Sequence, residues 1–251
     1  MRLEKKRRFH RGIYILPNLF TIAALFAGFY AIIAAIRSEY DVAAITIFIA
    51  MLMDSLDGRV ARITNTQTEF GAQLDSLSDM VSFGIAPALV MYNWILLNLG
   101  KIGWLIAFIY AVAVALRLAR FNTQIGKIDK RYFQGLACTP AAGVMAGLIW
   151  IGSDFNLYTN FIAILAGILS IIIASLMVSN IRFRSFKDFD LKNNVSFVKI
   201  LTMVMVIVLV AIDPPITLFT AFFLYAISAP LINLWELRKK KRLLRKHKSS
   251  F

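Results

Sequence analysis

Residues 54–79 read DSLDGRVARITNTQTEFGAQLDSLSD and place Asp54, Asp57, Asp75 and Asp79 between long apolar segments. A charged side chain within a membrane-spanning helix costs about 2.5 to 3.5 kcal/mol, so four carboxylates here require a compensating positive charge. The stretch contains no histidine or cysteine of the kind that binds zinc. Hard divalent cations are therefore the expected counter-charge.

The composition of the whole chain is that of an integral membrane protein. Hydrophobic residues make up 59% of the 251 residues, and the mean hydropathy is +0.70, whereas soluble domains are typically about 45 to 50% apolar. The formal net charge of +14 comes from basic residues in the tails and between the apolar runs. Because no nucleic-acid-reading element is recognisable among them, we expect membrane lipids as partners and no nucleic acid.

A membrane span needs about 20 mostly apolar residues, and applying that length along the chain predicts about eight transmembrane helices. We therefore expect an all-α fold, a polytopic membrane helical bundle that forms a single domain over residues 1–251. The predicted spans are approximately residues 14–37, 40–62, 72–98, 102–122, 136–153, 158–179, 197–212 and 215–235.

The distribution of Lys and Arg predicts that both termini are cytoplasmic. With this topology, 26 of the 28 basic residues lie inside and only Arg37 and Lys101 lie outside, as the positive-inside rule requires. The spacing of Phe183, Phe186 and Phe189 predicts a short interfacial helix in the loop after the sixth span. The same topology puts the four aspartates near the cytoplasmic ends of the second and third helices.

The spacing of the aspartates predicts that they converge. Asp54 and Asp57 are three residues apart and Asp75 and Asp79 four apart, so each pair lies on one helical face. The two helices are antiparallel neighbours joined by a short turn. Gly58 continues the face of the second helix and leaves room for a ligand.

Ligands that are all oxygen suit Mg²⁺ or Mn²⁺. Two such ions would balance the four carboxylates, and a two-metal centre stabilises the attacking and leaving oxygens of phosphoryl transfer. The substrate is then expected to be a phosphate diester or anhydride. Arg62, just beyond the last aspartate of its helix, would donate its planar guanidinium to a phosphate.

Two other interpretations of the aspartates stay open. A cation transporter also carries intramembrane acids, although usually near the bilayer midplane on broken helices. A structural role, with pairing to Arg59 and Arg62, would account for only one or two aspartates. Cys138 lies in the small-residue stretch GLACTPAAG and is expected to serve helix packing, with no chemistry of its own.

The pattern of fixed residues resembles the signature of the CDP-alcohol phosphatidyltransferase family at every position. Its first part ends at Arg62, and its second part starts at Gly71 after eight intervening residues. Members are integral membrane enzymes that move a phosphatidyl group from a CDP-linked lipid to an alcohol and release CMP. The resemblance implies that two divalent cations, Mg²⁺ or Mn²⁺, are held by Asp54, Asp57, Asp75 and Asp79, and that Asp79 is also the catalytic proton acceptor. It further implies contacts to the CDP-lipid from Asn18, Thr21, Gly58, Ala61, Arg62, Thr68 and Gly71.

Other segments resemble the bacterial integral-membrane branch of this family that uses serine. They are LPNLFTIAALFAGFYAI, SFGIAPALVMY, ALRLARFN, FQGLACTPAAG and SNIRFRSFKDFD. This resemblance implies CDP-diacylglycerol as the donor and L-serine as the acceptor. Candidate serine contacts are Ser82, Arg117, Arg120, Asn122, Arg182 and Arg184, with Arg120 and Arg184 the preferred pair. Glycerol 3-phosphate or an inositol phosphate as acceptor, and a cation transporter, remain alternatives.

The family also implies a division of the chain. Residues 1–13 would be a basic cytoplasmic tail, 14–179 a six-helix catalytic core, 180–196 a cytoplasmic loop, 197–235 two additional helices and 236–251 a second basic cytoplasmic tail. The resemblance places the protein in the bacterial inner membrane with its active site on the cytoplasmic side. Homodimers are common in the family, so a homodimer is an expectation, although one sequence reveals no interface.

Overall fold

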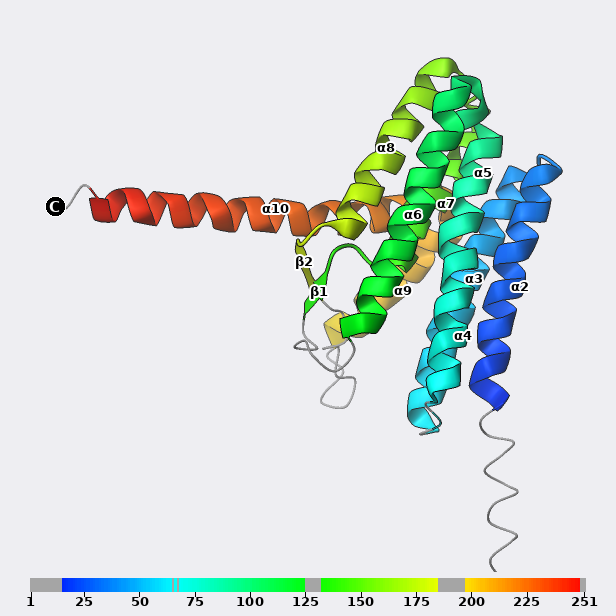
Figure 1. Ribbon diagram of the computed structural model, residues 1–251, viewed down its shortest axis with the longest axis horizontal. Coiled ribbons are helices and arrows are strands. Elements are labelled where there is room, and N and C mark those ends of the chain that lie inside the picture. The colour runs from blue at the N-terminus through cyan, green and yellow to red at the C-terminus, as the bar shows by residue number, and fades with distance from the viewer. Residues whose placement is uncertain (1–14, 65, 67, 125–131, 185–196, 249–251) are drawn as a thin grey trace, which may run out of the picture.

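The computed structural model describes residues 15–64, 66, 68–124, 132–184 and 197–248, and it is a bundle of long helices (Figure 1). In chain order the elements are α2 (Ile15–Ile36), α3 (Tyr40–Ile63), α4 (Glu69–Asp79), the π-helix η1 (Met80–Ile85), α5 (Ala86–Trp94), the 3₁₀-helix η2 (Leu96–Leu99), α6 (Lys101–Gln124), β1 (Tyr132–Gln134), α7 (Cys138–Asp154), α8 (Asn160–Val178), β2 (Arg182–Arg184), α9 (Phe197–Ile212) and α10 (Pro214–Lys248).

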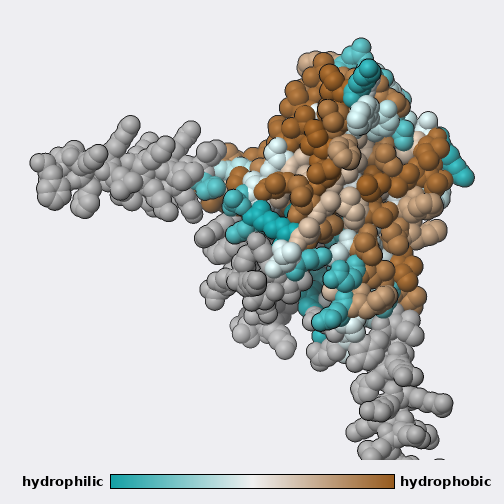
Figure 2. Space-filling model, in the orientation of Figure 1, coloured by the Kyte–Doolittle hydropathy of each residue, from teal (hydrophilic) through white to brown (hydrophobic). Residues whose placement is uncertain are grey.

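Within the described residues, five helical segments are long and apolar enough to cross a membrane. They are Leu16–Ile36, Glu69–Trp94, Lys101–Thr123, Asn160–Val178 and Pro214–Asn233. Figure 2 shows an apolar surface over the middle of the bundle with hydrophilic residues gathered toward its ends, as expected for a protein that lies in a bilayer. These findings support an integral membrane protein.

The other three predicted spans are also helices. α3 carries Asp41, Asp54, Asp57, Arg59 and Arg62, while α7 has 17 residues and α9 has 16. Each predicted span is helical, because a chain in lipid must satisfy its backbone hydrogen bonds within the helix. The bounds are similar except at the last span, predicted as 215–235, where α10 extends to Lys248.

Small residues let α2 approach its neighbours closely. Alanines of α2 and α3 are buried together, among them Ala31 and Ala43, each 0% exposed. A Cβ added at Gly28 would lie 2.6 Å from the Cα of Ser82 in η1. Because lipid provides no hydrophobic drive between helices, such close packing is what holds a membrane bundle together.

In the part of the chain that the structure describes, two three-residue strands interrupt the helices. β1 and β2 pair antiparallel, with Gln134 opposite Arg182 and Tyr132 opposite Arg184. The sequence did not predict this ribbon. The predicted interfacial helix through Phe183 is wrong at that residue, since Phe183 pairs with Phe133 in the ribbon, where backbone hydrogen bonds are satisfied between strands. Phe186 and Phe189 lie outside the described residues.

The last helix, α10, runs across the bundle rather than along it (Figure 1). It packs on α7, where a Cβ at Gly143 would lie 2.6 Å from Phe222 and one at Gly147 would lie 2.8 Å from Phe219. It also continues to Lys248, through most of the segment predicted as a basic tail. The run LRKKKRLLRKHK has no Gly or Pro to end a helix, and its residues are good helix formers.

Acidic residues of three connections gather at one end of the molecule. Burial, followed by the nearby carboxylates of Asp41 and Asp213, raises the pKa of Asp154. Asp41 begins α3, Asp154 ends α7 and Asp213 lies between α9 and α10. These three points therefore lie at the same end, which the Lys and Arg distribution predicts to be the outer one.

Candidate metal centre and active site

Three of the four aspartates form one cluster, where α3 ends and α4 begins. One carboxylate oxygen from each of Asp54, Asp57 and Asp75 lies within 4.8 Å of the others. Asp57 is buried, at 6% exposure, and the other two are half-buried. The convergence predicted from the spacing is therefore present in the fold.

A short, self-bonded turn between α3 and α4 brings the cluster together. The Thr64 hydroxyl contacts that of Thr66 at 2.7 Å, and the Thr66 amide donates to the carbonyl of Ala61. The side chain of Thr68 then caps α4 by accepting a hydrogen bond from the Gly71 amide at 3.0 Å. Such a cap satisfies an otherwise unpaired amide at the helix start. Thr68, predicted as a lipid contact, thus has a structural partner within the protein.

Asp79 lies at the inner edge of the cluster, at the last residue of α4. Its carboxyl group lies close to that of Asp54 and accepts a hydrogen bond from the Sγ of Cys138 at 3.6 Å. The π-helix η1 follows directly, and such local widening of a helix is frequent at functional sites. Asp79 is therefore joined to the three-aspartate cluster through Asp54.

Cys138 connects the carboxylates to a cation, which the sequence analysis did not foresee. Arg117 of α6 donates from Nη1 to the Cys138 Sγ at 3.3 Å, and its guanidinium lies over the ring of Phe121, 5.6 Å from the centroid. Cys138 is buried, at 2% exposure. No sequence signal marks this link, because α6 and α7 meet here only through the tertiary fold.

Helix α2 supports the other side of the cluster. The Thr21 hydroxyl donates to Oδ2 of Asp57 at 2.7 Å, and the Ser78 hydroxyl donates to the carbonyl of Thr21 at 3.0 Å. Asn18 faces the start of α4, since a Cβ at Gly71 would lie 3.4 Å from its Oδ1. The structure thus brings Thr21 next to Asp57 and Asn18 next to Gly71; their predicted contact with the CDP-lipid stays a prediction.

One side of the cluster is open. A Cβ added at Gly58 would meet no atom within 4 Å, so packing in this structure does not require a glycine there. Arg62 is exposed, and its Nε donates to the carbonyl of Gly58 at 2.8 Å. Ala61 is half-buried on the same helix. This side offers space and a positive charge for an anionic ligand.

The predicted serine contacts differ in where they lie. Arg117 points toward the aspartates, and Asn122 bonds to Ser76 of α4 through its Nδ2, at 3.0 Å. Ser82 is 0% exposed, with its hydroxyl donating to the carbonyl of Ala24 at 2.9 Å, so it packs against α2 instead.

Arg120 is directed to the end of α8. Its Nη1 donates to the carbonyls of Val178 and Ser179 at 3.2 and 3.4 Å, and its Nη2 bonds to the side chains of Gln134 and Asn180. Arg182 and Arg184 form β2, and their side chains are outside the described part. Of the four candidates whose side chains the structure describes, Arg117 has the most direct connection to the carboxylates.

The carboxylate cluster fits a hard divalent cation. Two oxygen ligands of one octahedral ion at about 2.1 Å lie about 3.0 Å apart when adjacent and about 4.2 Å apart when opposite. The three aspartate oxygens, within 4.8 Å of one another, approach these separations closely enough for small side-chain rotations to complete the geometry. Without a cation the carboxylates would repel each other in a partly buried place.

The comparison with protein families matches the chain to a model described as CDP-alcohol phosphatidyltransferase over residues 14–173. This match spans more than half of the chain and includes all four aspartates. The chain belongs to the CDP-alcohol phosphatidyltransferase family. Members of this family use a divalent metal, and the cluster of Asp54, Asp57 and Asp75 could hold one.

Several curated members of the family are similar to this chain. A Helicobacter pylori (strain ATCC 700392 / 26695) protein is 36% identical over 184 residues, which are 70% of this chain and 74% of that protein. A Bacillus subtilis (strain 168) protein is 33% identical, over 71% of this chain and 94% of its own length. A Methanocaldococcus jannaschii protein is 38% identical, over 57% and 63% respectively. All three are named CDP-diacylglycerol--serine O-phosphatidyltransferase.

Proposed function

We propose that this protein is a CDP-diacylglycerol–serine O-phosphatidyltransferase, a phosphatidylserine synthase. It transfers the phosphatidyl group of CDP-diacylglycerol to L-serine, forming phosphatidylserine and CMP in phospholipid synthesis. The observation that carries this proposal is the cluster of three aspartates within 4.8 Å, built on the family signature. The names of the relatives support serine as the acceptor.

We propose that Asp54, Asp57, Asp75 and Asp79 hold two divalent cations, Mg²⁺ or Mn²⁺. The proximity of Asp79 to Asp54 supports including it in the ligand set. When bound, the cations supply positive charge for the diphosphate of the donor. The oxygen-only donor set favours hard ions over zinc or copper.

The CDP-lipid lies, in this proposal, on the open side of α3. Gly58 leaves room for the ligand, and Arg62 supplies a planar donor to a phosphate. Thr21 orients Asp57 through its 2.7 Å hydrogen bond. The remaining proposed contacts are Asn18, Ala61, Thr68 and Gly71, which lie along α2, α3 and the start of α4.

Replacing Gly58 by alanine tests this placement. We expect turnover to fall about 10- to 100-fold, because a methyl group would displace the bound donor from its reactive position. The fold should be unaffected, since a Cβ there meets nothing within 4 Å. CMP release and thermal unfolding in detergent measure the two effects.

Gly28→Ala is the matched control. Its added Cβ would lie 2.6 Å from the Cα of Ser82, so this change should lower thermal stability. A Gly58→Ala protein with full turnover would show that the donor does not approach α3 at this residue.

The reaction itself asks little more of the protein than positioning and one proton transfer. The serine hydroxyl oxygen bonds to the phosphorus that carries diacylglycerol, and the bond from that phosphorus to CMP breaks. Asp79 accepts the hydroxyl proton. Its hydrogen bond from Cys138 supports this role by keeping one carboxylate oxygen, Oδ2, turned toward α7.

We propose that Arg117 binds the carboxylate of serine. It is linked through Cys138 to the proposed base, so a carboxylate held by Arg117 would bring the serine hydroxyl close to Asp79. Asn122, bonded to Ser76 next to Asp75, is the second proposed contact. Arg182, Arg184 and Ser82 remain weaker candidates, and the contacts of Arg120 favour a different role.

Removing the charge of Arg117 should affect serine more than the lipid. Loss of a hydrogen bond to a charged group corresponds to about a 10- to 100-fold rise in the KM for serine in Arg117→Gln. The KM for CDP-diacylglycerol should change little. Lys101→Gln, at the opposite end of α6, is the control and should alter neither KM. Equal rises in both KM values would contradict a specific serine contact.

The topology proposed is eight spans with both termini cytoplasmic, in the bacterial inner membrane, and with the metal centre on the cytoplasmic side. Residues 14–179 form the catalytic core and residues 197–235 add two helices. The position of 26 of 28 basic residues supports this orientation. A homodimer in the membrane remains an expectation.

The decisive experiment is an acceptor panel. Purified protein in detergent is given CDP-diacylglycerol and Mn²⁺ or Mg²⁺ with serine, glycerol 3-phosphate or an inositol phosphate, one at a time. We expect CMP release with serine alone, and none from an Asp75→Asn preparation made in parallel. CMP release with glycerol 3-phosphate and not with serine would contradict the proposal that serine is the acceptor. No CMP with any alcohol would overturn the reaction class and favour cation transport, measurable as flux in liposomes.

A further inference from the structure

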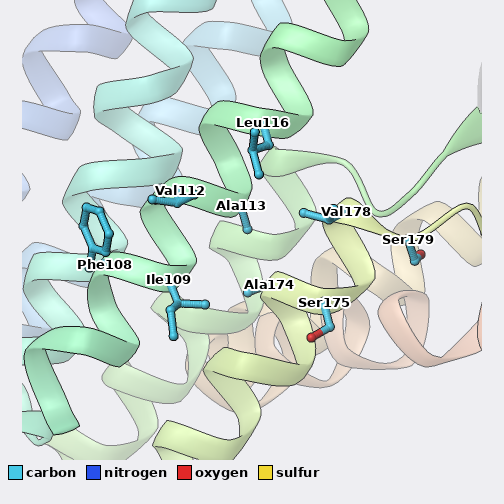
Figure 3. Close-up of a pocket in the computed structure, with 9 residues that line it drawn as sticks. All are labelled: Phe108, Ile109, Val112, Ala113, Leu116, Ala174, Ser175, Val178 and Ser179. Atoms are coloured by element: carbon cyan, nitrogen blue, oxygen red, sulfur yellow. The ribbon is translucent and has the colours of Figure 1, made fainter.

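A groove between α6 and α8 is separate from the metal centre. It encloses a volume of about 490 Å³ and is lined by side chains of α6 between residues 108 and 116 and of α8 between residues 174 and 179. Figure 3 shows the two sets of side chains facing each other, with Ile109 near Ala174 and Ala113 near Val178. The lining is apolar apart from Ser175 and Ser179, and it includes none of the aspartates.

The groove leads to Arg120. Ile109, Ala113, Leu116 and Arg120 are spaced by four, three and four residues and so lie along one face of α6. Val178 and Ser179, whose carbonyls accept hydrogen bonds from Arg120, line the groove on the side of α8. The apolar channel therefore ends at a guanidinium group.

Among the residues that the structure describes, no carboxylate balances the positive charge of Arg120. Its four hydrogen-bond acceptors are two backbone carbonyls and the side-chain amides of Gln134 and Asn180, all of them neutral. Within the described part of the chain, no carboxylate contacts Arg120. Its Nε is not used in these bonds, so the group keeps both charge and a donor for an anion such as a phosphate.

The neighbouring face of α6 serves the metal centre. Tyr110 donates to the carbonyl of Phe83, and Arg117 bonds to Cys138. The groove face points outward instead, with Leu116 54% and Val178 44% exposed. None of the aspartates, Arg117 or Cys138 lines the groove, so a ligand in it would lie beside the reacting groups and not among them.

We propose that this groove binds one acyl chain of an anionic membrane phospholipid, with the phosphate of that lipid against Arg120. An apolar groove that ends at the guanidinium of Arg120 is complementary to a phospholipid, in which an apolar acyl chain leads to a negatively charged phosphate. Both walls belong to helices long and apolar enough to span a membrane. A second copy of this chain, with its own formal charge of +14, would bring like charge to Arg120 and is the less suitable occupant.

The test uses full-length protein in nanodiscs with a phospholipid that carries a photoactivatable group in its acyl chain. Phosphatidylglycerol and phosphatidylcholine probes with the same chain are compared, and labelled peptides are mapped. We expect labelling of α6 and α8 within the groove, with phosphatidylglycerol preferred about fivefold, the contribution of one basic residue near the membrane surface.

Four variants sharpen the test. Ser175→Trp fills the groove from an exposed position and should reduce labelling severalfold while CMP release continues; Leu165→Trp, exposed on another face of α8, should not. Arg120→Gln should abolish the preference for phosphatidylglycerol, and Arg120→Lys should keep it. The lysine variant also separates lost charge from lost folding.

Four results would overturn the proposal. Equal labelling by both probes would show that an anionic headgroup is not preferred. Unchanged labelling of Ser175→Trp would show that the lipid does not bind in the groove. Displacement by CDP-diacylglycerol, but not by other anionic lipids, would make the groove part of the donor site. Crosslinking between two copies of the chain through the groove would make it a protein interface.

Discussion

Replacing Asp79 by asparagine should lower turnover about 100- to 10,000-fold, the range that a positioned general base contributes. Asparagine has nearly the same shape, so it can still accept a hydrogen bond from Cys138, which lies 3.6 Å from Oδ2 in the native protein. The protein should therefore remain folded and inserted, as checked by size-exclusion chromatography and thermal unfolding. CMP release in the presence of serine measures the effect.

Asp79 also belongs to the proposed ligand set, so its two roles must be separated. If it acts only as a ligand, high Mn²⁺ should restore the activity of Asp79→Asn. If it accepts the proton, saturating Mn²⁺ should fill the site, as measured by electron paramagnetic resonance, while turnover stays low. Full recovery with Mn²⁺ would remove Asp79 as the base. Cys138→Ala is a useful companion, because it removes the hydrogen bond to Asp79 and retains the carboxylate.

Removing divalent cations should lower turnover at least about 100-fold, because a bound cation stabilises transition-state charge by several kcal/mol. Mg²⁺ or Mn²⁺ should restore turnover. Ca²⁺ should restore it poorly, since it prefers six to eight oxygen ligands at about 2.3 to 2.6 Å, a looser arrangement than a compact aspartate cluster. Turnover after chelation and titration with each ion measures this.

Stability provides an independent control on metal binding. Mg²⁺ or Mn²⁺ should raise the unfolding temperature of the native protein, because a ligand that binds only the folded state stabilises it. In Asp75→Asn the metal-free protein should be more stable than the native one, since one of three carboxylates within 4.8 Å has lost its charge. The same variant should need more metal. Activity that survives chelation, with no thermal shift, would contradict a metal centre at these residues.

Hydropathy alone predicted the helices well, because these segments are expected to lie in lipid and not in water. A chain in lipid can satisfy its backbone only by forming helices or closed barrels, so a long apolar run has few alternatives. The predicted and observed bounds of α2 and α3 therefore nearly coincide, at 14–37 against Ile15–Ile36 and 40–62 against Tyr40–Ile63. The prediction was poorest in the polar segments outside the predicted spans, at β1, β2 and the end of α10.

The candidate site was predictable to the extent that it is local. Spacings of three and four residues place the aspartates on helical faces, and one short turn brings the two helices together. The roles of neighbouring residues were less accessible. Thr68 is a helix cap, and Arg120 binds the end of α8 rather than pointing to the aspartates, because each side chain finds its nearest acceptors in the folded chain.

The sequence by itself determined the chemistry. Four carboxylates in an apolar chain, spaced by three and four residues so that each pair lies on one helical face, predict a site for hard cations. This prediction does not depend on how the other helices pack. Only the tertiary structure decided what surrounds that site. The link from Arg117 through Cys138 to Asp79 and the groove that ends at Arg120 both depend on how α6 packs against α7 and α8. Helix packing is set by side-chain fit between segments far apart in the chain, and no local spacing encodes it.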